Sequence, residues 1–300
     1  MILFLILFLI LLLVSIIFRI IVFHPWTVWL HAVRDLVNYV SLHKRNEAPY
    51  GTIKCYIAHQ GTAFGTGKTL TATRELVQAY NKYNGKAVYC PRRKRMVTQR
   101  VHILSNVDLL SVPFERLVSL SQFVAETDTM QELDDDNGTL TVTYLFIDEA
   151  SSQLNSRSFK SNFDAPFISR LLTSRHVRAN LILTSQRSGM VDKLMRDCTN
   201  YYISCQKLWR FEILRFYDAY EIECATDPAT VAPLHRSGYF INDKLFSNYD
   251  TYSMVQALEK SCKEGDMLSA DQILQLRQGD SMMQAKSKRQ AKKRRKRVRG

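Results

Sequence analysis

The stretch GTGKT, residues 65 to 69, combines the residue types that a phosphate-binding loop requires. Gly65, Thr66 and Gly67 would let backbone N–H groups turn toward phosphate oxygens, because glycine adopts backbone conformations that other residues avoid. Lys68 can reach the β- and γ-phosphates of a nucleotide, and the Thr69 hydroxyl can ligate Mg²⁺. This stretch therefore predicts a site for ATP with Mg²⁺.

The sequence around this loop has the order of elements that such a site needs. Residues 53–58, IKCYIA, are typical of a buried strand, and a helix-forming stretch runs from the loop to about residue 83. The loop would then lie at a helix N-terminus, where the helix dipole favours an anion. One position departs from the usual spacing, because Thr62 stands where the first glycine is expected and Gly61 comes one residue too early. The alternative is a glycine turn with a surface lysine.

Two acids follow the next apolar run. Residues 144–147 are apolar and lead into Asp148 and Glu149, so we expect a buried parallel strand on a neighbouring position of the sheet, with both acids at its carboxyl end. We assign Asp148 to the metal ion and Glu149 to the catalytic base that orients the attacking water. The alternative is a strand that simply stops at two solvated acids.

A third apolar run, within residues 178–187, ends in Thr184, Ser185 and Gln186. Polar groups at such a strand end could sense the γ-phosphate or position water. Arg175 precedes this run and is our candidate for an arginine that completes the site of a neighbouring subunit in a ring. A solvated helix face explains Arg175 equally simply.

These three sites, each at the end of an apolar run, predict an α/β fold, namely a P-loop NTPase with a central, mostly parallel sheet flanked by helices. The chain has 300 residues and is 46% hydrophobic, which is enough for one such domain with terminal appendages. We place the ATPase domain at 51–250, a C-terminal helical segment at 251–280 and a disordered basic tail at 281–300. The acidic, turn-rich stretch 126–139 is expected to be a surface loop.

Residues 1–23 are expected to form a transmembrane anchor. They contain no charged side chain before Arg19, and their length approaches what is needed to span a hydrocarbon core of about 30 Å. The segment lacks the basic start and the cleavage site of a secretory signal peptide. Basic residues such as Arg34 and Lys44 follow it, so we expect a single-pass protein with its C-terminal domain in the cytoplasm, in a host inner membrane or a virion. Residues 24–50 are expected to form an interfacial amphipathic helix and a linker, with an ordinary packed helix as the alternative.

The positive charge of the chain is concentrated at one end. The formal net charge is +13, and ten of the 41 basic residues lie between Lys286 and Arg299. Such a tail attracts phosphates, so nucleic acid is the first expected partner and anionic lipid the second. The six cysteines show no metal-ligand spacing, and we expect them to be reduced thiols.

Four segments resemble the zonula-occludens-toxin-like (Zot-like) ATPases of filamentous phages, which belong to the FtsK–HerA class of DNA-pumping motors. They are GTGKT, ILSNVDLL (103–110), LFIDEAS (145–151) and the stretch 174–203, and the likeness covers about residues 52–210. The resemblance implies that Lys68 and Thr69 contact the phosphates and Mg²⁺, that Asp148 and Glu149 are the acids, and that Gln186 is the sensor. Arg175 and His176 match the Arg-His element of that family.

The activity that the resemblance implies is ATP-driven movement of DNA during virion assembly or export. Zot-like proteins typically place the ATPase first and cross the membrane later, whereas here the apolar segment comes first. We therefore expect a membrane-anchored ATPase that moves viral DNA as a homo-oligomeric ring, with DNA, the membrane and capsid or other virion proteins as partners. The alternatives are a cellular or plasmid DNA-transfer motor of the same class, and a membrane-tethered DNA-binding scaffold with an inactive nucleotide site.

Overall fold

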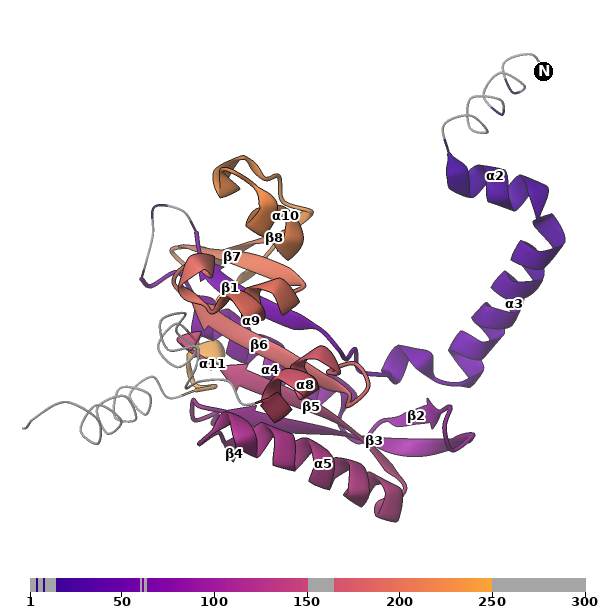
Figure 1. Ribbon diagram of the computed structural model, residues 1–300, viewed down its shortest axis with the longest axis horizontal. Helices are drawn as coiled ribbons and strands as arrows, with labels where there is room; N and C mark the ends of the chain where they lie inside the picture. Colours follow the sequence, from indigo (N-terminus) through magenta and orange to yellow (C-terminus); the bar gives the residue numbers. More distant parts are fainter. Residues whose placement is uncertain are drawn as a thin grey trace, which may run out of the picture. The chain divides into compact units, whose positions relative to one another are not determined.

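The computed structural model describes residues 15–59, 61, 64–150 and 165–249, together with Phe4 and Phe8. Residues 53–249 of this part form one mixed sheet of nine strands with helices on its faces (Figure 1). The expected α/β fold with a mostly parallel central sheet is therefore confirmed. The expected C-terminal helical segment, 251–280, and the basic tail, 281–300, lie outside the described residues.

The strands are β1 (Ile53–Ala58), β2 (Ala87–Cys90), β3 (Arg95–Ser105), β4 (Glu115–Arg116), β5 (Thr139–Ile147), β6 (Ala179–Ser185), β7 (Tyr201–Leu208), β8 (Phe211–Asp218) and β9 (His235–Phe240). Their order in the sheet is β2-β3-β5-β6-β1-β7-β8-β9, and β4 pairs with β3. The central strands β3, β5, β6, β1 and β7 are parallel to one another. The pairs β2–β3, β7–β8 and β8–β9 are antiparallel, so hairpins extend the sheet at both edges.

The helices of this domain are α4 (Lys68–Tyr83), α5 (Leu120–Asn137), α8 (Ala165–Leu172), α9 (Lys193–Cys198), α10 (Ala219–Cys224) and α11 (Asp243–Phe246). Alternate residues of β1 show which helices cover which face. Lys54 Nζ donates to Glu75 Oε1 of α4 at 2.7 Å. Cys55 points the other way, into a core with Phe123 of α5 and Phe167 of α8. Because successive strand residues face opposite sides, α4 covers one face of the sheet and α5 and α8 cover the other.

The central strands are buried because helices cover both faces. Every residue of β5 and of β6 is buried, including the three threonines of β5. The three strands expected from sequence are confirmed, and the helix expected after the loop does end at Tyr83. The strand that leads to Asp148 is longer than its apolar part, because it begins at Thr139.

The acidic stretch 126–139 is not a surface loop, and that expectation was wrong. Most of it is the second half of α5, which begins after the N-cap Ser119 and ends at Gly138 in the left-handed conformation. Asp134 is buried and accepts hydrogen bonds from both Thr139 and Thr141 at the start of β5. One acid of this run, Asp134, therefore holds the start of the next strand to the helix.

A buried glutamine joins the far end of α4 to the chain that precedes β1. Gln99 of β3 is fully buried. Its Nε2 donates to the carbonyl oxygens of Tyr83, at 3.0 Å, and Asn46, at 3.3 Å. Its Oε1 accepts from the Ala48 backbone N–H at 3.0 Å. The last turn of α4 and the linker into the domain therefore share one fixed side chain.

The N-terminal part contains two helices, α2 (Ile16–Phe23) and α3 (Pro25–Ser41), followed by a short 3-10 turn, η1 (Lys44–Asn46). Among the described residues no single helix meets the length and apolarity of a membrane span, whereas α2 and α3 together meet them but bend by 100° at their junction. A single helix over 1–23 is therefore not supported, and most of residues 1–14 lie outside the described part. The expected helix after residue 24 is confirmed as α3, and its apolar side chains, including Trp26 and Trp29, are exposed.

Candidate active site

The phosphate loop delivers its residues to the start of α4. Gly67 is the N-cap of this helix, with a φ of 84° that suits glycine, and no side chain caps the helix. The first N–H groups of a helix have no partner within it, so they can donate to an anion. Lys68 is only 6% exposed, and the buried Thr66 hydroxyl has no hydrogen-bond partner among the described residues. The loop thus offers backbone N–H groups, a hydroxyl and an ammonium group, as a triphosphate requires.

Asp148 lies where the sequence places the metal-binding acid, beside Thr69. The Thr69 hydroxyl donates to Asp148 Oδ1 at 2.8 Å, and Thr184 of β6 donates to the same oxygen at 2.5 Å. Burial raises the pKa of Asp148 to about 6, although the hydrogen bonds from Thr184 and Thr69 oppose that shift. A buried carboxylate held beside a threonine hydroxyl suits Mg²⁺, which prefers oxygen ligands and keeps several of its waters.

Asn106 fixes the backbone of Asp148, and we did not single it out from the sequence. Its Nδ2 donates to the Asp148 carbonyl oxygen at 2.9 Å, and its Oδ1 accepts from the Asp148 N–H at 2.8 Å. Asn106 directly follows β3, which lies next to β5 in the sheet. The one available signal was its position in ILSNVDLL, a segment of the resemblance to which we gave no chemistry.

Gln186 connects the lysine of the loop to the expected catalytic base. Its Oε1 accepts from Lys68 Nζ at 3.0 Å, and its Nε2 donates to Glu149 Oε1 at 2.8 Å. The backbone N–H of Glu149 also donates to the Thr184 hydroxyl at 2.9 Å, and Glu149 has a left-handed φ of 49°. A non-glycine residue in that conformation is uncommon and here aims the carboxylate toward Gln186. The structure thus brings Lys68, Gln186 and Glu149 together, as expected for a site that positions water at a γ-phosphate.

The sheet order explains why these residues meet. We expected Asp148 on a strand neighbouring β1, but β6 lies between β1 and β5. Thr184 and Gln186, at the end of β6, therefore lie between the phosphate loop and the two acids. The sequence of apolar runs could not predict this order, because chain order and spatial order differ in parallel sheets.

Glu212 of β8 is an unexpected acid at the loop. It is 1% exposed, and neither carboxylate oxygen has a hydrogen-bond partner among the described residues. A side chain added to Gly67 would meet this carboxyl group, with its Cβ only 2.7 Å from Glu212 Cδ. Burial raises the pKa of Glu212 to about 8, so the group is largely protonated at neutral pH. No sequence signal marked this position, which follows the stretch covered by the resemblance.

Arg175 does not lie at the site of its own chain. It lies in the turn before β6, and its backbone packs against Gly51, which precedes β1. Both positions are at the amino ends of their strands, whereas the site is at the carboxyl ends. The nearby Arg170 and Arg178 pair with Asp128 and Asp134 of α5, while Arg175 is exposed and makes no ion pair among the described residues. Arg175 therefore does not act at the site of its own chain in this structure, and its exposed position fits either a solvated side chain or a role toward another molecule.

A cavity of about 760 Å³ opens beside the site. Gly61 of the loop and Gln186 line it, together with three arginines from separate segments, Arg187, Arg215 and Arg236. Its volume lies in the range of small-molecule sites. The arginines make it suitable for an anionic ligand or part of one.

No protein-family model and no curated protein matches the chain. Among solved structures, the N-terminal domain of zonular occludens toxin from Neisseria meningitidis is 16% identical, with 67% of this chain and 100% of that chain covered and a TM-score of 0.41. The DNA-packaging ATPase B204 of Sulfolobus turreted icosahedral virus is 12% identical, with 65% and 100% covered and a TM-score of 0.39. EssC (ATPases 2 and 3) from Geobacillus thermodenitrificans is 11% identical, with 71% and 43% covered and a TM-score of 0.35.

Proposed function

We propose that this protein is a membrane-anchored, Mg²⁺-dependent ATPase that moves viral DNA during genome packaging or virion assembly, working as a homo-oligomeric ring. The observation that carries the ATPase part is the hydrogen-bonded series Lys68, Gln186 and Glu149, next to the pair Thr69 and Asp148. It unites a phosphate cradle, a metal-binding acid and a base with its orienting amide at one edge of the sheet.

In this proposal each side chain has a separate task. Lys68 and the first N–H groups of α4 would hold the β- and γ-phosphates, and Thr69 with Asp148 would hold Mg²⁺, which would supply neutralisation of phosphoryl charge. Glu149 accepts the proton of the attacking water, while Gln186 keeps that carboxylate in place and contacts Lys68. Arg175 acts on the neighbouring subunit, which explains its exposed position away from its own site.

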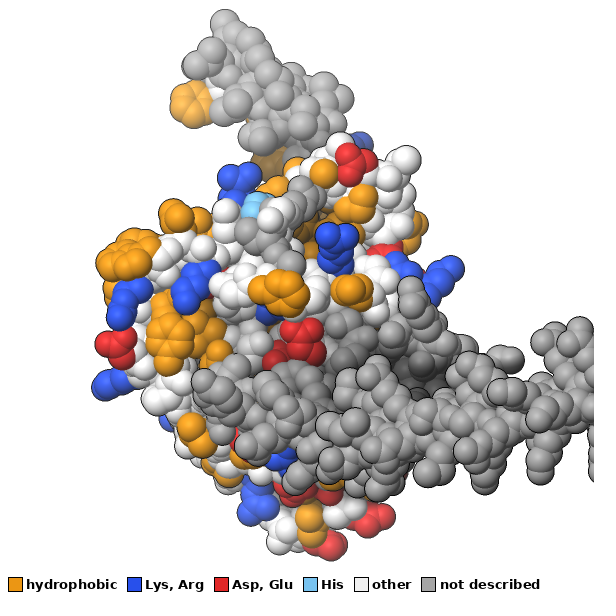
Figure 2. Space-filling view, turned by 90° about the vertical axis from the view of Figure 1, so that its left-hand side faces the viewer, with side chains coloured by type: hydrophobic (Ala, Val, Ile, Leu, Met, Phe, Trp, Pro, Cys, Tyr) orange, Lys and Arg blue, Asp and Glu red, His pale blue; other side chains and the backbone are white. Residues whose placement is uncertain are grey.

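The proposal that DNA is the cargo rests on exposed groups outside the nucleotide site. Trp209, Phe211 and Phe240 pack on one another with ring centroids 5.5 to 6.2 Å apart, and each is more than half exposed. Trp209 and Phe211 therefore do not belong to the core. Hydrophobic side chains also lie exposed among Lys and Arg side chains on the face shown in Figure 2. Aromatic faces near cations suit single-stranded nucleic acid, and the tail with its ten positive charges adds attraction to phosphates.

Membrane anchoring remains part of the proposal. The support is the apolar composition of residues 1–23 and the exposed apolar side of α3, which includes Trp26, Trp29 and Val33. An exposed apolar helix face of this kind suits the membrane interface. The capsid or another virion protein would be the partner that receives the DNA.

The first test is ATP hydrolysis by the full chain in detergent micelles, with and without Mg²⁺, single-stranded DNA and double-stranded DNA. Lys68→Ala and Glu149→Gln are the control variants. We expect Mg²⁺-dependent hydrolysis that increases with DNA and disappears in both variants. Absence of turnover at protein concentrations that support a ring would refute the motor and favour a tethered scaffold. Turnover that no DNA changes would refute DNA movement but keep the ATPase.

A further inference from the structure

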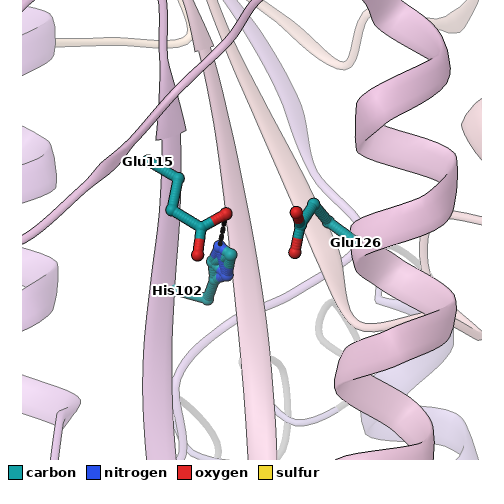
Figure 3. A group of neighbouring side chains, drawn as sticks. All are labelled: His102, Glu115 and Glu126. Atoms are coloured by element: carbon teal, nitrogen blue, oxygen red, sulfur yellow. Dashed lines mark ion pairs between the residues drawn. The ribbon is translucent and has the colours of Figure 1, made fainter.

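A second cluster of ligand-type side chains lies away from the nucleotide loop, on the sheet face that α5 covers (Figure 3). It consists of His102 from β3, Glu115 from β4 and Glu126 from α5. One ligand atom of each residue lies within 4.8 Å of those of the other two. The three residues come from three separate elements, so the fold brings them together and their spacing in sequence does not.

Neither nitrogen of the His102 imidazole makes a hydrogen bond among the described residues. Its side chain is only 9% exposed, and Nδ1 and Nε2 are both buried without a hydrogen bond among the described residues. The nearest carboxylate oxygen, Glu115 Oε2, is 3.6 Å from Nε2, which is too far for a hydrogen bond. In Figure 3 the ring lies between the carboxylates of Glu115 and Glu126. A buried polar group with no partner is costly, so this site lacks a component.

The side chains around His102 indicate which component is absent. Glu115 and Glu126 bring two carboxyl groups to the buried imidazole, and the three ligand atoms lie within 4.8 Å of one another. Two carboxyl groups and an imidazole form a donor set that a divalent cation would complete.

We propose that His102, Glu115 and Glu126 bind a divalent transition-metal ion of the Zn²⁺ type, separate from the Mg²⁺ of the nucleotide site. One nitrogen and two carboxylate oxygens are ligands that zinc accepts, whereas an imidazole is a poor ligand for Mg²⁺. Three protein ligands leave an outward position for water, and Glu115 is about half exposed, so the ion has a route of entry.

The distances fit such an ion with a small adjustment. Ligand bonds of about 2.0 to 2.2 Å in a tetrahedral arrangement place the ligand atoms roughly 3.3 to 3.6 Å apart. The separation between His102 and Glu115 already has this value, and the remaining separations, up to 4.8 Å, close by rotation of a glutamate side chain. The ion would join β4 and α5 to β3.

This position also relates the ion to the proposed ATPase. His102 is four residues before Asn106, which holds the backbone of Asp148. The ion would therefore brace the strand that positions the acid of the nucleotide site, without touching nucleotide. We assign the ion a structural role, because its three ligands come from three separate elements that it would hold together.

The test is a Zn²⁺ titration of the full chain in detergent, in competition with a chromophoric chelator and in excess Mg²⁺ so that the nucleotide site does not contribute. His102→Gln and Glu126→Gln are the ligand variants, and Glu132→Gln, an exposed acid of the same helix, is the matched control. We expect one Zn²⁺ per chain in the wild type and in the control, and affinity at least about tenfold weaker in each ligand variant. Hydrogen exchange along α5 should slow on addition of Zn²⁺ in the wild type and in the control, and not in the ligand variants.

Two results would overturn the proposal. One is a wild-type chain that takes up no more Zn²⁺ than the ligand variants. The other is uptake that all variants retain, which would place the ion elsewhere, for example at a cysteine. If His102→Gln fails to fold, Glu115→Gln replaces it, because that side chain is half exposed on a two-residue strand. Zinc binding is measured without nucleotide, so a protein that hydrolyses no ATP can still confirm the zinc site. A protein that binds no zinc can likewise still be an ATPase.

Discussion

The carboxyl group of Glu212 lies against the Cα of Gly67, and no side chain fits between them. Gly67 is the residue that ends the phosphate loop, and Glu212 belongs to β8, which lies two strands away from β1. The hairpin at this edge of the sheet therefore helps to shape the nucleotide site. Glycine at position 67 is required twice, once for its φ and once for this contact.

Gly67→Ala should abolish nucleotide binding and lower the free energy of unfolding by about 1 to 3 kcal/mol. The added Cβ would push Glu212 or the loop out of place. Gly85→Ala is the matched control, because Gly85 has a φ of 74° but open space around it. Thermal unfolding and binding of a fluorescent ATP analogue measure both effects. Equal losses in the two variants would show that backbone strain alone is responsible.

Glu212→Gln should stabilise the protein at high pH. Burial raises the pKa of Glu212 to about 8 from an ordinary 4.5, so the folded chain keeps a proton that the unfolded chain releases. The free energy of unfolding of the wild type therefore falls as pH rises from about 4.5 to about 8. The Glu212→Gln variant has no proton to lose at this position, so its free energy of unfolding does not fall for this reason. We expect a gain of roughly 1 to 3 kcal/mol at about pH 9 and little change near pH 5, measured by urea unfolding. A pH-independent difference between the two proteins would refute this.

Mg²⁺ should bind more weakly as pH falls through about 6. Burial raises the pKa of Asp148 to about 6, and the protonated acid is a poor partner for Mg²⁺. Below this pH the Mg²⁺ concentration needed for half-maximal hydrolysis should increase by about tenfold per pH unit. Titrations of activity with Mg²⁺ at several pH values measure this. A requirement that stays constant down to pH 5 would show that Asp148 does not hold the ion.

Gln186→Ala should lower kcat by about 10- to 1000-fold with little change in nucleotide affinity. The Gln186 amide contacts both Lys68 and Glu149. Its loss would leave the Glu149 carboxylate without this hydrogen bond, while the loop residues that are proposed to bind the phosphates stay in place. Steady-state kinetics and equilibrium binding of ATP separate the two effects. Weaker binding with unchanged kcat would instead assign Gln186 to holding the nucleotide.

Arg175→Ala should abolish ATP hydrolysis. Mixing this variant with a second inactive variant, Lys68→Ala, should restore part of the activity. In a ring, a Lys68→Ala subunit still carries Arg175, while an Arg175→Ala subunit still carries an intact nucleotide site. Mixing the two inactive proteins should therefore recover part of the wild-type rate, because an arginine of this kind acts on the neighbouring site. No recovery in the mixture, with both proteins assembled, would count against that role.

The phosphate loop was predictable because one short segment contains all of its parts. β1 and α4 lie on either side of the loop in sequence, and local preferences decide their boundaries, so both elements agree with expectation. Asp148 and Gln186 could also be predicted, since each ends a buried apolar strand. The carboxyl ends of parallel strands meet at one edge, which brings these residues together whatever the order of the strands.

The remaining parts depend on contacts between distant segments. Asn106 and Glu212 contact the site only because β3 and β8 take particular places in the sheet, and single-sequence patterns do not contain that order. The acidic run in α5 looked like a loop because its charges mask a helix that one buried acid, Asp134, holds to the sheet. Sequence reasoning failed where a polar residue is buried by its tertiary partners.

Helix α4 also has a mechanical consequence. It is a single helix of 16 residues, about 24 Å long, with Lys68 in its first turn and the carbonyl oxygen of Tyr83 in its last. Gln99 ties that last turn to Ala48, at the root of the N-terminal segment. If nucleotide hydrolysis moves the first turn of α4, the helix would move as one body. Gln99 would then transmit that movement to Ala48 and to the N-terminal segment that precedes it.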